Sequence, residues 1–179
     1  MSLFAASTGK YGVKVAQNAT RLTADVTDVA TTIPTAHDCF ADSQNVIIET
    51  ELITIGTHGM SNTGCTRHVS PTSATAHSGP DGDSYGAAEV RAEDGAEILS
   101  KVFGIGEKLT VLRVSANAPV TIGVDLGGTL EYAGGKISYE LQEFFHAQTQ
   151  ITFGVETTVK IYAWNANAFP VMVHAAMGA

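Results

Sequence analysis

The chain is poor in charged side chains, aromatic side chains and cysteines. Charged residues make up 16% and aromatic residues 7% of its 179 residues, and an average soluble domain has roughly a quarter of its residues charged. A surface poor in charge is typical of one that another protein covers, although a compact β-domain rich in Thr, Ser and Gly has the same composition. Two cysteines do not make a disulfide framework, which favours synthesis in a reducing cytoplasm.

Long apolar runs are also absent from the sequence. No stretch approaches the ~18 apolar residues of a membrane helix, and residues 3–6 are too few for the core of a secretion signal. The formal net charge of −8 argues against general nucleic-acid binding, since that needs a concentrated basic surface. We therefore expect neither a membrane nor a nucleic acid as partner.

The N-terminal residues differ in charge from the rest of the chain. Lys10, Lys14 and Arg21 precede the first acidic residue, Asp25, and acidic residues dominate from there on. Residues 1–22 are therefore predicted to be an extended arm whose basic side chains contact an acidic neighbour. The alternative is a terminal tail without a role.

Alternating apolar and polar residues predict an all-β fold. β-Branched and aromatic residues are enriched in the predicted strands, and glycine pairs and asparagines supply turns between them. In a predicted strand ending near Gly56, the residues Val46, Ile48, Thr50, Leu52 and Thr54 fall on one face. The other predicted strands are 108–115, 120–126, 136–141, 150–155, 159–164 and 170–174.

The predicted architecture is a small N-terminal β-module followed by an antiparallel β-sandwich, jelly-roll-like, with at most one short helix. That helix is predicted at residues 92–103, where Ile98, Leu99, Val102 and Phe103 occupy neighbouring positions. Residues 140–147 are predicted as strand followed by loop in preference to helix. A Gly-rich and acidic stretch at 79–95 predicts the boundary, so the expected domains are 1–22, 23–88 and 89–179.

Residues ~20–88 resemble a β-rich module that is common in virion proteins of tailed bacteriophages. The acid-bearing strand of that module corresponds to IIETELITIG at 47–56, with Glu51 at the matching position. Its run of the form T-R-G-x-x-G-T-T-A-x-x-H-x-x-G is similar to residues 64–82. The residues that match in register are Thr66, Arg67, Thr72, Ala74, His77 and Gly79.

The same run departs from the module at three positions. His68 and Pro71 stand where the module has glycine, and Ser73 stands where it has threonine. Glycine permits backbone conformations that other residues disfavour, so the loop geometry is expected to differ here. The resemblance covers roughly two-fifths of the chain.

The resemblance implies a structural component of the virion, assembled in the host cytoplasm. We expect a capsid decoration (cement) protein that binds and stabilises neighbouring capsid subunits, with the major capsid protein as partner and a homo-oligomer, preferably a trimer. The alternatives are a tail, neck or fibre-adaptor protein, or a carbohydrate-binding module of a host-contact fibre. The aromatic side chains available for carbohydrate are Tyr132, Tyr139, Tyr162 and Trp164.

Glu51, Arg67 and His77 are predicted to be structural staples of the module. An arginine between threonines can donate up to five hydrogen bonds, and Glu51 on the preceding strand is its expected acceptor. One ring N–H of His77 is expected to donate to a carbonyl group and so fix the closing loop. This interpretation assigns no catalytic residue, cofactor site or metal site, and we expect no enzymatic activity.

Two reactive alternatives are weaker. A metal site would use His58, His68, His77, Asp81 and Asp83, but their spacing fits no zinc pattern. A thiol nucleophile would use Cys65 with His68 as its base. We expect Cys65, like Cys39, to be a small buried apolar residue instead.

Overall fold

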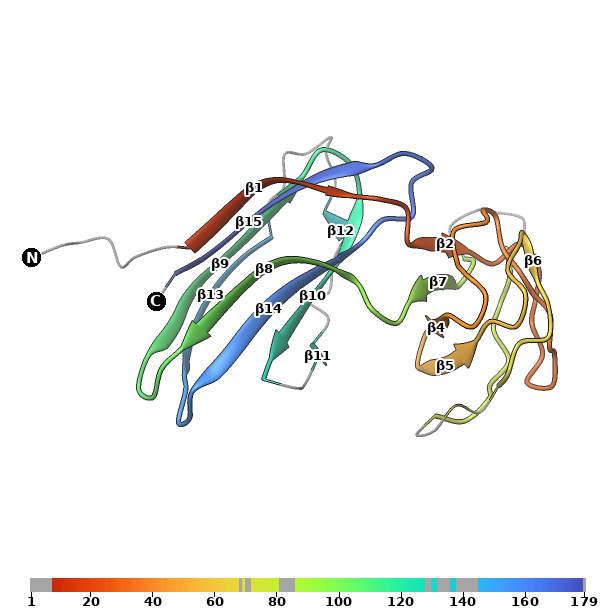
Figure 1. Cartoon of the computed structure of the whole chain (residues 1–179), viewed down its shortest axis with the longest axis horizontal. Coiled ribbons are helices and arrows are strands. Elements are labelled where there is room, and N and C mark those ends of the chain that lie inside the picture. The colour runs from red at the N-terminus through yellow and green to blue at the C-terminus, as the bar shows by residue number, and fades with distance from the viewer. Residues whose placement is uncertain are drawn as a thin grey trace, which may run out of the picture. The chain divides into compact units, whose positions relative to one another are not determined.

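A computed structural model describes residues 8–67, 69, 72–80, 86–127, 130–131, 136–137 and 145–178, with the backbone alone at 130–131, 136–137 and 145–150. The described residues form antiparallel strands and no helix, which confirms the predicted all-β class (Figure 1). Accordingly, this part of the chain contains no helix able to cross a membrane.

The chain divides into two compact units. The unit that we call the sandwich contains the described residues up to Ala16, residues 96–165 and those from Phe169 onward. The unit that we call the module contains Gln17–Gly95 with Ala166–Ala168. Each unit has its own hydrophobic core.

The sandwich consists of two sheets that share one core (Figure 1). Side chains of both sheets meet in this core, among them Phe103, Leu112, Ile122, Ile161 and Val173, as expected for two sheets packed face to face. A jelly-roll connectivity stays a prediction. The first sheet has the order β1 (Thr8–Val15), β15 (Val171–Gly178), β9 (Lys108–Ala116) and β13 (Phe145–Thr152). The second has the order β11 (Leu130–Glu131), β10 (Val120–Leu126), β14 (Thr157–Trp164) and β8 (Ala96–Phe103), with β12 (Lys136–Ile137) also pairing β10.

The module contains shorter strands and longer loops. Its four-stranded sheet has the order β2 (Ala19–Arg21), β7 (Glu89–Ala92), β4 (Asn45–Ile48) and β5 (Glu51–Thr54). A two-stranded sheet pairs β3 (Ile33–Pro34) with β6 (Ser61–Asn62). Because the short strands form few backbone hydrogen bonds, the N–H and C=O groups of the loops depend on side chains as hydrogen-bond partners.

The predicted free arm is wrong for residues 8–21. Lys10 and Lys14 lie on β1, which pairs with β15 at the edge of a sandwich sheet, and Val15 at its end is buried. Arg21 lies on β2 of the module. The pairing of β1 shifts register between Lys10 and Val13, and such a bulge interrupts the alternation by which a strand is recognised. The predicted domain 1–22 thus contributes a strand to each unit, and residues 1–7 lie outside the described part.

The predicted helix at 92–103 is also wrong. Ala92 ends β7, and residues 96–103 form β8. In the pairing of β8 with β14, Leu99 faces Ile161 and Glu97 faces the next residue, Tyr162, so Ile98 has no partner on β14. This bulge buries Ile98 and Leu99 together, which resembles helical spacing in the sequence. The boundary accordingly falls after Gly95, so β7 belongs to the module.

The stretch ending near Gly56 is a hairpin and not one strand. Strands β4 and β5 are joined by Glu49 and Thr50, and Ile48 faces Glu51 across the turn. Because the two-residue turn reverses the chain, the buried set is Val46, Ile48, Glu51 and Ile53, so the predicted face is correct on β4 and wrong on β5. A carboxylate thereby enters the core side of β5.

Candidate functional site

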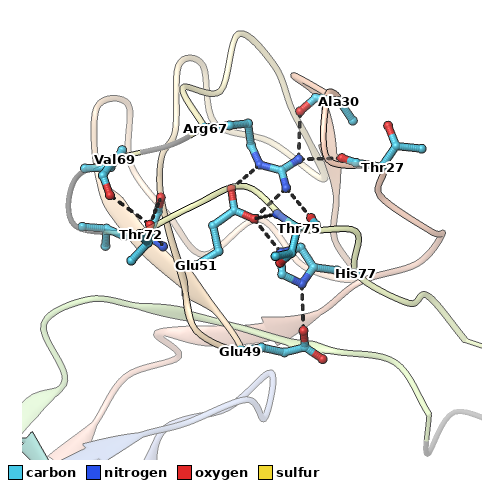
Figure 2. A network of polar contacts seen from close by, with 10 residues as sticks. Thr27, Ala30, Glu49, Glu51, Arg67, Val69, Thr72, Thr75 and His77 are labelled. Carbon is cyan, nitrogen blue, oxygen red and sulfur yellow. Dashed lines mark hydrogen bonds and ion pairs between the residues drawn. The ribbon is translucent and has the colours of Figure 1, made fainter.

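The candidate site is a network of polar contacts inside the module (Figure 2). Glu51 begins β5, directly after the hairpin turn. Thr66 pairs with Thr54 of the same strand, which brings Arg67 beside it, and His77 pairs with Val26. The structure therefore brings Glu51, Arg67 and His77 together from three separate segments.

Arg67 uses all three guanidinium nitrogens. Nε donates to Oε1 of Glu51 at 2.6 Å and Nη2 donates to Oε2 at 2.7 Å, which is the two-point geometry that makes arginine–carboxylate pairs strong. Nη1 donates to the carbonyl oxygens of Thr27 at 2.8 Å and Ala30 at 3.1 Å. Nη2 also donates to the carbonyl oxygen of Thr75 at 2.7 Å. One side chain thus joins a strand to two loops.

The Glu51 carboxylate is completely buried, with 0% of the side chain exposed. In addition to Arg67, it accepts hydrogen bonds from the backbone N–H of Thr75 at 3.0 Å and lies 2.8 Å from Nε2 of His77. Burial alone would raise the pKa of Glu51, but the hydrogen bonds from Arg67, Thr75 and His77, with the charge of Arg67, lower that pKa to about 2. Glu51 is therefore the shared acceptor that holds the network together in its ionised form.

The ring of His77 lies between two carboxylates. Nε2 faces Glu51, and Nδ1 lies 3.0 Å from Oε2 of Glu49. A ring in this position donates to both only when both nitrogens carry a proton. The expected donation to a carbonyl group is therefore wrong, and the closing loop is fixed by backbone hydrogen bonds with Val26 at 2.8 and 2.9 Å.

Glu49 was not predicted as part of the site. It has a φ of 55°, a left-handed conformation that a residue other than glycine rarely adopts. The first loop position of a tight hairpin commonly needs such a φ, and the contact with His77 favours glutamate there. No sequence pattern predicts the role of Glu49. Thr27, Ala30 and Thr75 contribute backbone atoms, and their side chains therefore give no indication of the contact.

Thr72, a matching residue of the run, also holds backbone. Its Oγ1 accepts a hydrogen bond from the N–H of Leu52 at 3.0 Å and donates one to the carbonyl oxygen of Val69 at 2.9 Å. The loop is thereby fastened to β5 one residue beyond Glu51. The departures at His68 and Pro71 lie outside the described residues.

Gly79 lies where no side chain fits. A Cβ atom at this position would be 2.3 Å from the carbonyl carbon of Ala24 and 2.6 Å from the backbone nitrogen of Asp25. The Gly79 N–H donates to Oδ1 of Asp25 at 2.7 Å. Glycine is thus required here by close approach of two backbone segments.

We predict that Gly79→Ala destabilises the module by about 1–3 kcal/mol, because backbone must move to admit the methyl group. Gly86→Ala is the matched control, since a Cβ at Gly86 meets nothing within 4 Å. Urea unfolding of the two variants checks this. Equal midpoints for both would show that the close approach at Gly79 is not rigid.

The reactive alternatives find little support in the described residues. These contain no group of three side chains suited to a metal ion, and His58 instead pairs with Asp38 at 2.9 Å, while His68, Asp81 and Asp83 lie outside them. Burial raises the pKa of the Cys65 thiol, which disfavours the thiolate that a nucleophile needs. Cys39 and Cys65 are both free thiols.

The network of Glu51, Arg67 and His77 suits the stabilisation of loops and not the turnover of a substrate. The Glu51 and His77 side chains are buried, and a substrate would have to displace Arg67 from five hydrogen bonds to reach the carboxylate. Breaking such a buried pair is costly. Comparisons of the chain with models of protein families and with curated protein sequences find no match.

Proposed function

We propose that the chain is a non-enzymatic structural subunit of a tailed-bacteriophage particle, with capsid decoration as its preferred role. The observation that carries the proposal is the structural role of the matching residues in the run at 64–82. Arg67, Thr72 and His77 each hold a strand or loop of the module in place. The resemblance therefore rests on residues that determine the structure of the module.

Accessibility supports a scaffold in preference to an enzyme. The titratable side chains at the centre of the network, Glu51, Arg67 and His77, are all buried. General acid–base catalysis requires a group within hydrogen-bond reach of a substrate. These side chains instead reach one another, the Glu49 carboxylate and backbone groups of neighbouring loops.

The loops at one end of the sandwich support contact with other subunits. Ile105, after β8, and Val155, after β13, are both largely exposed. Their loops are fastened together by hydrogen bonds of Phe153 with Gly106 at 2.8 Å and with Glu107 at 3.0 Å. Two exposed apolar side chains on tied loops suit the contact core of a protein interface.

The carbohydrate-binding alternative loses its main candidate. Sugar stacking needs an exposed aromatic face, and Trp164 is only 1% exposed. Its neighbour Tyr162 lies on the same strand, with ring centroids 6.4 Å apart. Tyr132 and Tyr139 lie outside the described residues.

The test is the position and copy number of the chain in intact particles, by quantitative mass spectrometry and electron cryo-microscopy. Hundreds of copies on the capsid are expected for a decoration protein. Three to about a dozen copies would favour the tail, neck or fibre-adaptor role, on the order of what point-group symmetry allows. Absence from purified particles would overturn the proposal.

A further inference from the structure

The charge of the chain is segregated between its two units. The module has 11 of the 18 acidic residues and three of the 10 basic ones, so its formal charge equals the −8 of the whole chain. The sandwich has seven acidic and seven basic residues and is formally neutral. Every copy of the chain therefore has an acidic module and a formally neutral sandwich.

Within the sandwich, the basic residues favour one sheet. The strands β1, β15, β9 and β13 contain no Asp or Glu. On the outer side of this sheet, Lys14 faces Met172 and Arg113 faces Ala176. Both basic side chains are exposed, and neither has an ion pair among the described residues.

Aromatic and apolar groups accompany these charges. Tyr11 is 81% exposed, and its ring lies 6.0 Å from that of His174. The Gly12 N–H donates to Nδ1 of His174 at 3.0 Å, which fixes the ring beside the bulge of β1. Tyrosine, methionine and arginine are enriched at protein interfaces. We call the set Tyr11, Lys14, Arg113, Met172 and His174 the basic sheet face.

On the module, the buried network holds in place an exposed turn whose charge is opposite to that of the basic sheet face. Arg67 binds the carbonyl oxygens of Thr27 and Ala30 from inside, and the Ala30 N–H closes the turn onto Thr27 at 3.1 Å. The central residues of this turn are Asp28, which is exposed, and Val29, which is 80% exposed. Asp28 has no hydrogen bond or ion pair in the described part of the chain. The turn is thus a rigid tip with one free negative charge and one apolar side chain.

We propose that the basic sheet face of one copy binds the Thr27–Ala30 turn on the acidic module of a second copy. Asp28 then meets Lys14 or Arg113, and Val29 packs beside Met172. Because the contact joins two different surfaces, it is heterologous and builds a ring or a chain of subunits. The inference depends only on charge and geometry and stands apart from the proposed role in a virion.

Salt dependence distinguishes this contact from non-specific association. Two chains of charge −8 repel each other, so added salt would normally favour association. A contact between opposite charges weakens instead as the Debye length falls from about 14 Å at 50 mM to about 4 Å at 500 mM salt. We expect sedimentation velocity on the full chain to show concentration-dependent association at the lower salt and at least tenfold weaker association at the higher.

Two variants and their mixture test the surfaces. Lys14→Glu/Arg113→Glu and Asp28→Lys should each reduce self-association at least tenfold. An equimolar mixture should associate again, because the unaltered module of the first fits the unaltered sheet of the second. Lys160→Glu, which reverses one charge on the other sheet, is the control and should associate like the unaltered chain. Circular dichroism confirms folding of each variant.

Three results would overturn the inference. The unaltered chain could remain monomeric at about 100 μM in 50 mM salt, or both surface variants could associate like the control. The mixture could also fail to associate, which would point to a contact between two like surfaces.

Discussion

Arg67→Met lowers the free energy of unfolding of the module by about 3–5 kcal/mol, because it leaves the buried Glu51 carboxylate without its counter-ion. The variant also removes the donors to Thr27, Ala30 and Thr75, so two loops lose their attachment. Urea unfolding followed by methyl NMR of isoleucines measures the effect. Isoleucines of the module, Ile53 and Ile55, should lose their native signals before those of the sandwich.

The controls separate burial from charge. Lys160→Met breaks an ion pair with Glu97, whose side chain is 44% exposed, and should leave the unfolding midpoint unchanged, since exposed pairs contribute little. Glu51→Leu in the Arg67→Met background removes the unpaired charge and should recover part of the loss. If Arg67→Met had no larger effect than Lys160→Met, the network would not stabilise the module.

Acid destabilises the module through the same carboxylate. The pKa of Glu51 is lowered from 4.5 to about 2 in the folded chain. A lowered carboxyl pKa contributes stability that is complete above the unfolded value and is lost as the pH falls through the folded one. Between about pH 5 and pH 2, the unfolding free energy of the module should fall by about 3 kcal/mol from this group.

Urea titrations at pH 7, 5, 4, 3 and 2 measure this slope in the unaltered chain and in Glu51→Gln. The glutamine variant starts less stable at pH 7 and should have a flatter profile, because its side chain does not titrate. Parallel profiles for the two proteins would assign the acid sensitivity to other groups.

Strands with regular alternation could be predicted from the sequence. The predicted strand 120–126 coincides with β10, and 108–115 and 159–164 lie within β9 and β14. Two of the errors arose where alternation fails. Bulges at Gly12 and Ile98 concealed β1 and β8, because an unpaired residue changes which side chains face the core.

The candidate site was predictable in its charged members and not in its backbone. Arg67 among threonines and an acid on a strand pointed to the Glu51–Arg67 pair, which the structure contains. The carbonyl groups of Thr27 and Ala30 gave no signal, since every residue carries a carbonyl. The position of Glu49 depends on the positive φ of a turn residue, and a glutamate in the sequence does not predict such a φ.

The Nε–H of Arg67 tests the central claim most directly. A ¹H–¹⁵N spectrum of the arginine side chains at pH 7 should contain one slowly exchanging Nε–H resonance, assigned by its loss in Arg67→Met and shifted in Glu51→Gln. That result would place a protected, charge-assisted hydrogen bond at the centre of the module. Rapid exchange of the Arg67 Nε–H, with no response to Glu51→Gln, would contradict the staple and the scaffold built on it.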